Sequence, residues 1–432
     1  MKAAFHTLGC KVNSYETQAA LEQFRAASFE IVDFSEKADV YIINTCSVTQ
    51  TAGHKSRQMI NRARKLNPGA VIVAVGCYAQ EDAERLLADD PGILIIGNNH
   101  KNEIVPAVLE ILAGKQDACR CTDMLKCRDY EEQSITGHEG STRAYIKIQD
   151  GCDRFCSYCI IPYLRGRSRC RDEVNIIKEA KTLAAAGYRE IVITGIDISS
   201  YKELGTLAFK LNDIPGIERI RFGSFEVSKI TEEFLGRIIS CEKICPHFHL
   251  SLQSGSDSVL KRMNRRYTAA EYAHAVDLIR KYYDAPGLTT DIIAGFPGET
   301  DAEFEETLRF AEKIAFTQAH IFKFSARSGT RAALMPGQIP AAVKAARSAE
   351  LIRLTDALKA RYEDSFTGRT ACVLLEQQCR DENGEMFITG FTPEYVKIAI
   401  KEPAKGNNEI VPVHICGRVR IAGEDMLTGM PE

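Results

Sequence analysis

The chain has 432 residues, which is too long for one ordinary domain and predicts two to four of them. Its hydrophobic fraction of 45% is that of a globular protein. No apolar run reaches the length of a membrane span, and the first residues lack the apolar core of a signal peptide. We therefore expect a cytoplasmic protein with no membrane partner. A net charge of −3 does not indicate a nucleic-acid partner, and any such partner would have to bind local basic patches.

The N-terminal segment alternates short apolar runs with helical patterns. This alternation predicts a parallel α/β sheet domain over residues 1–113. The predicted strands are Ala3–Leu8, Val40–Asn44, Val71–Val75 and Ile93–Ile96, and the predicted helices are Ser14–Ala27, Ala52–Leu66, Gln80–Leu87 and Glu103–Leu112.

Three of these strands run directly into a cysteine: Cys10, Cys46 and Cys77. The carboxyl ends of parallel strands gather at one edge of a sheet, where ligands bind, so the three thiols should converge. Buried core thiols are the alternative, since free cysteine is often buried. The repeated position favours a three-thiolate metal site, and clustered cysteines in a reducing compartment more often bind metal than form disulfides.

Residues 114–140 are polar and are interpreted as a linker. They contain Cys119, Cys121 and Cys127. These could bind metal, but no predicted strand or helix positions them, so we expect exposed cysteines without a function.

A second α/β alternation covers residues 141–367. Six strands with intervening helices predict an incomplete (β/α)6 barrel, which places its chemistry at the carboxyl ends of the strands. The predicted strands are Arg143–Gln149, Glu190–Thr194, Ile217–Gly223, His247–Leu252, Leu288–Ile293 and Gln318–Phe322, and the clearest helices are Val174–Ala186, Ala269–Tyr283, Asp301–Ile314 and Ala341–Glu363.

The first barrel strand is followed by a close cysteine motif, Cys152-x3-Cys156-x2-Cys159. Thiolates select zinc, copper(I) or iron–sulfur clusters, and three ligands leave one metal position open. A structural zinc site with a distant fourth ligand is the alternative. At a barrel mouth, a 4Fe–4S cluster with one open iron can chelate the amine and carboxylate of S-adenosylmethionine and cleave its C–S bond by electron transfer.

Other strand ends offer groups that can contact this cofactor. Tyr158 can pack on the nucleoside, or only shield the cluster. The remaining candidates are Thr194, Gly195 and Asp197 after the second strand, Ser224 and Glu226 after the third, Gln253 after the fourth and Gly295 after the fifth. Each is weak alone, because turns use the same residues; their shared position at the strand ends strengthens them together.

Two dense arginine stretches flank the predicted barrel mouth. They supply Arg165, Arg167 and Arg169 in the first and Arg265 and Arg266 in the second. Charge runs are usually solvated surface, and phosphate contact is the second interpretation.

Residues 368–432 form short strands with polar turns, which predicts a small all-β barrel of a kind that often binds nucleic acid. Acids outnumber bases here, so binding would rest on a few residues such as Lys397 and Arg418. The predicted strands are Thr370–Gln377, Phe387–Thr392, Val396–Ile400, Ile410–Gly417 and Val419–Ala422.

With these motifs the chain resembles the methylthiotransferase family of radical S-adenosylmethionine enzymes over nearly its whole length. The resemblance rests on Thr7–Asn13, Asn44–Thr49, Val75–Cys77, the central cysteine motif and Arg165–Arg169. It implies that Cys10, Cys46 and Cys77 hold an auxiliary 4Fe–4S cluster that carries the sulfur, and that Cys152, Cys156 and Cys159 hold the radical cluster. One S-adenosylmethionine would methylate the sulfur, and another would yield the 5′-deoxyadenosyl radical that opens a C–H bond. The tail resembles the TRAM domain, which binds tRNA in this family.

Within the family, Thr7-Leu8-Gly9-Cys10-Lys11-Val12-Asn13 is similar to the branch that acts on N6-threonylcarbamoyladenosine (t6A) next to the tRNA anticodon. The resemblance implies a monomer served by an external electron donor such as a flavodoxin or ferredoxin. Isopentenyladenosine in tRNA and a ribosomal-protein aspartate are the alternative substrates, and a non-catalytic iron–sulfur RNA-binding protein is the alternative class. Asp197 and Cys170 depart from the family pattern, where Asn or His and Ser are common.

Overall fold

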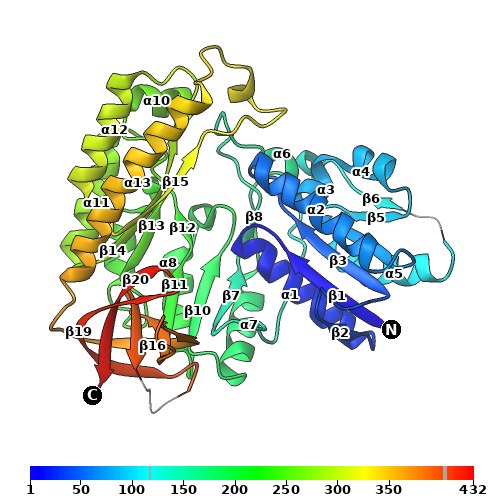
Figure 1. The fold of residues 1–432 in the computed structure, drawn as a ribbon, viewed down its shortest axis with the longest axis horizontal. Coiled ribbons are helices and arrows are strands. Elements are labelled where there is room, and N and C mark those ends of the chain that lie inside the picture. Colours follow the sequence, from blue (N-terminus) through cyan, green and yellow to red (C-terminus); the bar gives the residue numbers. More distant parts are fainter. Residues whose placement is uncertain (116–117, 402–405) are drawn as a thin grey trace.

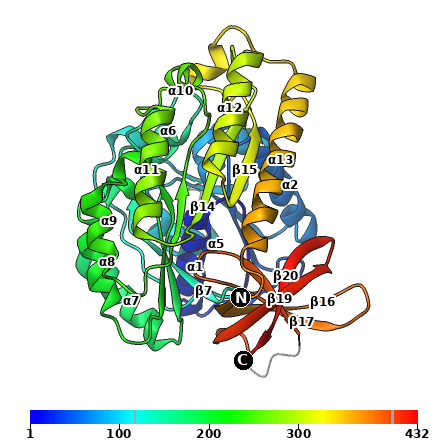
Figure 2. The same cartoon turned by 90° about the vertical axis from the view of Figure 1, so that its left-hand side faces the viewer.

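The computed structural model describes residues 1–115, 118–401 and 406–432. They form an N-terminal α/β domain, a central barrel and a C-terminal β-barrel that lies beneath one end of the central barrel (Figures 1 and 2). The mixed α/β class and this order of architectures confirm the fold predicted from the sequence.

The N-terminal domain is a parallel sheet in the strand order β2-β1-β3-β4-β5-β6. Apolar side chains of alternate strand positions pack under helices on both faces, because βαβ crossovers cover both sides of a parallel sheet. The strands are β1 Lys2–Thr7, β2 Glu30–Val32, β3 Val40–Thr45, β4 Val71–Gly76, β5 Ile93–Ile96 and β6 Cys119–Arg120, and the helices are α1 Lys11–Ala26, α2 Gln50–Leu66, α3 Cys77–Glu81, α4 Ala83–Asp89 and α5 Ile104–Leu112.

Two sequence predictions differ from this domain. The helix expected over Gln80–Leu87 is two helices, α3 and α4, separated at Asp82, whose backbone leaves the helical region. The expected linker contributes strand β6, so Cys119 lies at the edge of the sheet, and Cys121 packs against the sheet's core. Strand β6 has only two residues, which is too short for a strand pattern to be recognised in the sequence.

The central barrel is open. Its strands follow the order β7-β10-β11 and then β12-β13-β14-β15, with β11 and β12 consecutive in the chain. In the described residues β7 pairs only with β10 and β15 only with β14, which confirms the predicted incomplete barrel. The strands are β7 Arg143–Lys147, β10 Glu190–Thr194, β11 Arg219–Phe222, β12 Ser224–Phe225, β13 His247–Leu250, β14 Gly287–Ala294 and β15 Gln318–Lys323, with a small ribbon of β8 Gln149–Asp150 and β9 Arg169–Cys170.

Helices cover the outside of the barrel, and their apolar faces form one large core with the outward side chains of the strands. Two of them start with complete capping boxes, Thr268 with Glu271 and Thr300 with Glu303, which satisfy the first backbone N–H groups of each helix. The helices are α6 Ile161–Arg165, α7 Glu173–Ala185, α8 Leu204–Asn212, α9 Glu232–Ile238, α10 Asp257–Arg262, α11 Ala269–Tyr282, α12 Asp301–Ile314 and α13 Ala341–Asp364.

The C-terminal body is a closed five-stranded barrel in the order β16-β17-β18-β20-β19. Its strands are β16 Thr370–Arg380, β17 Met386–Phe391, β18 Lys397–Lys401, β19 Ile410–Ile421 and β20 Glu424–Pro431. The two strands predicted over Ile410–Ala422 are therefore one continuous strand, and β20 was missed. Its polar start and its Gly and Pro resemble a disordered tail, yet it pairs with both β19 and β18 and closes the barrel.

The N-terminal domain closes the open side of the central barrel. Helix α1 begins at the end of the domain that faces the barrel and packs against β7 (Figure 1). No helix in the described residues has the length and apolar composition needed to cross a membrane.

Candidate active site

Cys10, Cys46 and Cys77 follow three neighbouring strands of the N-terminal sheet, β1, β3 and β4. The register pairs Thr7 with Asn44 and Thr45 with Gly76, so the strands end side by side. The thiol of Cys46 lies within electrostatic range of both Cys77 and Cys10, and burial together with these neighbours raises the pKa of Cys46 to about 11. The structure thus brings the three cysteines to one edge, as the strand-end pattern predicts.

Two glycines make this convergence possible. Gly9 and Gly76 adopt φ of +107° and +96°, a region that side chains rarely enter. A Cβ atom on Gly9 would lie 3.0 Å from the Cys46 sulfur, and one on Gly76 would lie 2.4 Å from Oδ1 of Asn44. Sterics therefore explain why glycine, and no larger residue, precedes Cys10 and Cys77.

A buried charge network joins this edge to the central barrel. Arg165 of α6 donates to both carboxylate oxygens of Glu16 in α1, at 2.9 and 3.1 Å, and to Asp150 of β8 at 3.1 Å. Lys147 bridges the same two acids at 2.7 and 2.6 Å, and Lys101 lies 3.3 Å from Glu16. All five residues are at most 4% exposed.

The network has three cations and two carboxylates, so it carries one excess positive charge. Nε of Arg165 lies 3.4 Å from the sulfur of Cys77. A thiolate at Cys77 would balance the excess charge, and cluster ligands bind as thiolates. The donor set and its electrostatics therefore fit a thiolate-bound cluster at this edge.

The second cysteine group, Cys152, Cys156 and Cys159, lies in the loop between β8 and α6, at the carboxyl end of the barrel. This loop is held by hydrogen bonds from Ser157 N–H to the Met263 carbonyl and from Asn264 Nδ2 to the Phe155 carbonyl, each 2.9 Å. The thiols of Cys152, Cys156 and Cys159 lie close enough to interact electrostatically, as the motif spacing predicts.

Burial raises the pKa of Cys152 and of Cys159 to about 12, and the neighbouring cysteines add to this effect. Thiols in this setting stay protonated unless a cation compensates them, and iron supplies that compensation when it binds. Nη1 of Arg265 also lies 3.5 Å from the Cys156 sulfur, the counterpart of Arg165 at Cys77. The residues fit a radical-type 4Fe–4S cluster.

In the part of the chain that the structure describes, no three side chains of His, Cys, Asp or Glu are arranged as ligands of a single metal ion. In a 4Fe–4S cluster each thiolate binds a different iron atom, so its ligands stand further apart than around one ion.

The two carboxylates expected to contact the cofactor are joined by an arginine that sequence reasoning missed. Arg154, inside the cysteine loop, lies 3.0 Å from Asp197 and 3.3 Å from Glu226. The backbone N–H of Asp197 also donates to Oε1 of Gln149 at 2.7 Å. This arrangement fixes both acids beside the cysteine loop. The role of Arg154 becomes visible only in the three-dimensional structure, because its two partners are distant in the sequence.

The other cofactor candidates lie around the same mouth. Tyr158 packs edge-on against Phe296, with ring centroids 6.5 Å apart. Thr194 and Gln253 are buried, Ser224 is exposed, and Gln253 has a left-handed backbone with φ +69°. At Gly295, φ is +73° and the backbone N–H points to the Glu299 carboxylate at 3.2 Å; Gly195 packs on Gln149.

Three of the predicted RNA-binding arginines are buried or engaged by protein groups. Arg165 and Arg169 are 0% and 6% exposed, and the guanidinium of Arg165 is used by the buried network. Arg265 is occupied by Cys156, the Ser251 carbonyl and the Tyr267 ring. The burial of Arg165 and Arg169 speaks against direct RNA contact, and a charge run does not reveal burial; contact by Arg265 stays a prediction.

The remaining basic candidates are accessible. Arg167 and Arg266 are exposed at the barrel mouth, and Arg167 also covers the Phe155 ring. Lys397 pairs with Glu424 at 2.7 Å, and Arg418 pairs with Glu363 and Asp364. Their contact with RNA stays a prediction.

The lumen of the central barrel is lined by charged and polar side chains near the strand starts. Arg143 of β7 pairs with Glu376 at 2.7 Å, Arg221 of β11 pairs with Glu190 at 2.8 Å, and His249 of β13 lies 3.2 Å from Asp291. These side chains come from five strands of the central barrel, with Glu376 from β16, and form a polar floor below the cysteine loop.

The loop between β17 and β18 inserts Tyr395 into this floor. Its ring stacks on His247 at 4.8 Å and on Phe391 at 4.6 Å, and the guanidinium groups of Arg143 and Arg221 lie over it at 5.2 and 4.8 Å. The C-terminal barrel is therefore anchored on the central barrel through this tyrosine.

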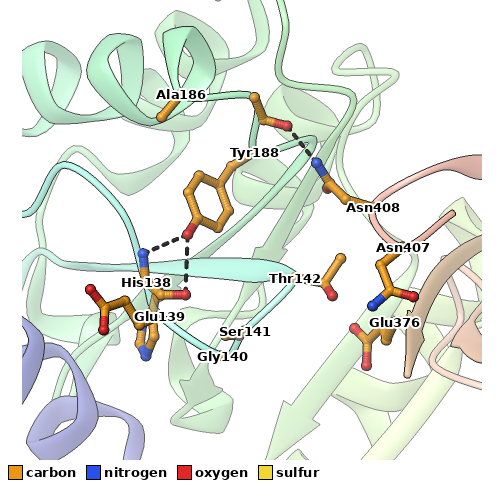
Figure 3. A pocket seen from close by; sticks show the side chains of 11 residues that line it. His138, Glu139, Gly140, Ser141, Thr142, Ala186, Tyr188, Glu376, Asn407 and Asn408 are labelled. Atoms are coloured by element: carbon orange, nitrogen blue, oxygen red, sulfur yellow. Dashed lines mark hydrogen bonds between the residues drawn. The ribbon is translucent and has the colours of Figure 1, made fainter. Parts of the chain in front are cut away.

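A separate polar hollow of about 440 Å³ lies between Tyr188, the segment 138–142 and Glu376 with Asn407 and Asn408 (Figure 3). The Tyr188 hydroxyl accepts from His138 N–H at 2.6 Å, and Asn408 donates to the Gly187 carbonyl at 2.7 Å. None of the predicted site residues lines it, so it takes no part in the site.

Two family models match the chain. The radical S-adenosylmethionine superfamily matches residues 146–311, and the uncharacterized protein family UPF0004 matches residues 2–97. Together with the open barrel and its cysteine loop, these matches define a radical S-adenosylmethionine protein, whose cofactors are S-adenosylmethionine and 4Fe–4S clusters.

Curated relatives define the family more closely. The chain is 39% identical to the threonylcarbamoyladenosine tRNA methylthiotransferase MtaB of Bacillus subtilis, over 95% of this chain and 93% of the relative, and 36% identical to that of Aquifex aeolicus over 89% and 95%. It is 33% identical to the tRNA-2-methylthio-N6-dimethylallyladenosine synthase of Clostridium novyi over 88% and 87%. The chain belongs to the methylthiotransferase family of radical S-adenosylmethionine enzymes.

A solved structure shares the fold at low identity. The radical S-adenosylmethionine methyltransferase TsrM of Kitasatospora setae aligns with a TM-score of 0.57 at 15% identity, over 77% of both chains.

The buried network predicts a loss of stability in acid. Burial alone would raise the pKa of Glu16, but Arg165, Lys101 and Lys147 hold it well below its ordinary value, and Asp150 behaves likewise. Below about pH 4.5 the unfolded state then binds more protons than the folded state. The contribution of these two groups to the free energy of unfolding should therefore be constant above about pH 5 and fall as the pH drops further.

Denaturant midpoints measured against pH test this. The Glu16→Gln variant should be less stable at pH 7 and lose less on acidification, whereas Glu84→Gln, on an exposed position of the same domain, should follow the wild type. Equal acid slopes for the wild type and Glu16→Gln would contradict the assignment.

Proposed function

We propose that the chain is a tRNA methylthiotransferase that adds a methylthio group to C2 of t6A at position 37, next to the anticodon. The observation that carries this is the pair of cysteine groups, one at the strand ends of the N-terminal sheet and one at the barrel mouth. Relatives named for that substrate align over 89% to 95% of the chain.

We assign Cys10, Cys46 and Cys77 to an auxiliary cluster and Cys152, Cys156 and Cys159 to the radical cluster. When bound, the two clusters and S-adenosylmethionine supply the electron, the radical and the methylated sulfur. The chain's own residues hold these groups: Arg165 and Arg265 place a positive charge beside one cysteine of each set, and Arg154 orients Asp197 and Glu226 beside the cysteine loop.

The domains then divide the work. Residues 1–113 with β6 carry the auxiliary site, the barrel within 141–367 carries the radical site, and the barrel of 368–432 binds tRNA. Arg167 and Arg266 at the mouth, with Lys397 and Arg418 on the C-terminal barrel, are the accessible basic residues for phosphate contact. We infer a monomer reduced by an external donor of the flavodoxin or ferredoxin class.

The test uses reconstituted protein with S-adenosylmethionine, a reductant and RNA, followed by nucleoside mass spectrometry. The 2-methylthio derivative should form on t6A-containing tRNA. Isopentenyladenosine-containing tRNA and a ribosomal protein, assayed in parallel, should give much less product. Product on isopentenyladenosine alone, or none with both clusters intact, would overturn the proposal.

A further inference from the structure

Lys11 occupies a distinctive place in the molecule. It is the first residue of α1, it follows Cys10 directly, and it is exposed. Its ammonium interacts electrostatically with Tyr395 of the C-terminal barrel, with Arg143 on β7 and with His320 on β15. Strands β7 and β15 are the two that end the open barrel. The side chain therefore lies in the gap through which the barrel lumen opens toward the cysteines of the N-terminal domain.

The other charged groups around Lys11 have ion-pair partners of their own, and Glu190 is shared by Arg221 and Arg219. Arg143 has Glu376, Arg221 has Glu190, and His249 has Asp291. In residues 1–115, 118–401 and 406–432, no hydrogen bond or ion pair is made by the Lys11 side chain, although it stands among these groups. An accessible cation that makes no hydrogen bond or ion pair within the described residues, at the entrance to a polar lumen, is suited to an anionic ligand.

The side of this gap formed by β14 and β15 is accessible to solvent. On β15, His320 is exposed and Phe322 is 46% exposed, and on β14 Asp291 and Ile293 are only half-buried. Alternate residues of β14 are thus accessible where the strand faces the lumen, while their neighbours Ile292 and Ala294 are buried in the core.

The proposed substrate has the required anion. In t6A the substituent on N6 ends in a carboxylate, and C2 and C6 of adenine flank the same ring nitrogen, N1. A base whose C2 faces the cysteines of the N-terminal domain directs its N6 substituent to the neighbouring wall. We propose, on the basis of the proposed function, that Lys11 binds the threonyl carboxylate of t6A and selects this substrate over adenosines with an apolar N6 group.

The test is a cycle of two enzymes and two RNAs. The RNAs are anticodon stem-loops that carry t6A or its threonyl methyl ester at position 37. A charge-assisted hydrogen bond predicts that the wild type prefers the free carboxylate by about 10- to 100-fold in kcat/KM and in binding affinity. For Lys11→Gln the preference should fall to about one, and Lys11→Arg should keep part of it. Lys37→Gln, on an exposed position of the same domain, is the matched control and should retain the wild-type preference.

Other outcomes overturn the inference. An equal loss on both RNAs would assign Lys11 to a phosphate, and an unchanged preference in Lys11→Gln would remove it from substrate recognition. If the wild type made no product on t6A, the proposed function would fail, while the affinities for the two stem-loops would still decide whether Lys11 reads a carboxylate.

Discussion

Replacing Cys156 by alanine should abolish the formation of 5′-deoxyadenosine from S-adenosylmethionine under reducing conditions. Cys156 is 9% exposed, and Arg265 and the other two cysteines of its loop surround it. Its removal leaves two ligands where three are needed to keep a 4Fe–4S cluster with one open iron. Liquid chromatography of the reaction mixture, with iron content measured on the same sample, gives the result.

Cys170→Ala is the matched control for that experiment. Cys170 is exposed in the same domain, and its thiol donates a hydrogen bond to the Ser200 carbonyl. This variant should cleave S-adenosylmethionine as the wild type does. Deoxyadenosine from Cys156→Ala at the control's rate would remove Cys156 from the ligand set.

Replacing Arg165 by methionine should cost about 3–5 kcal/mol in the free energy of unfolding, because removing one partner of a buried ion pair leaves the others uncompensated. Arg165 is fully buried, and with Lys147 it links the charges of the N-terminal domain to those of the barrel. Its guanidinium contacts Glu16, Asp150 and Asn13. Denaturant unfolding measures the loss.

Arg167→Met provides the comparison, two residues away in the same stretch. Its side chain is 48% exposed, and its contacts with the exposed Asp153 and with the Phe155 ring lie at the surface. Its substitution should therefore change the unfolding free energy by about 0.5 kcal/mol or less. Similar effects for the two arginines would contradict the network's role in joining the domains.

The sequence predicted the cysteine groups well because their signals are local. A strand that ends in a cysteine, repeated at three parallel strands, specifies convergence, and the register of β1, β3 and β4 confirms it. The order of the three bodies follows equally from periodicity.

The partners of charged residues could not be predicted. Arg165 and Glu16 are 149 residues apart, so no local pattern distinguishes this buried arginine from the exposed Arg167. Arg154 and the position of Lys11 in the gap were missed for the same reason. Strand β20 was missed because two neighbouring strands, rather than its own composition, hold it in place.

The measurement that tests the account most directly compares Cys10→Ala with Cys156→Ala in iron content, deoxyadenosine and methylthio product on t6A-containing tRNA. If the two cysteine groups hold separate clusters, each variant should retain about half of the wild-type iron. Cys10→Ala should still form deoxyadenosine without methylthio product, and Cys156→Ala should form neither. Methylthiolated tRNA from Cys10→Ala, or loss of deoxyadenosine in that variant with its second cluster intact, would contradict the division of roles.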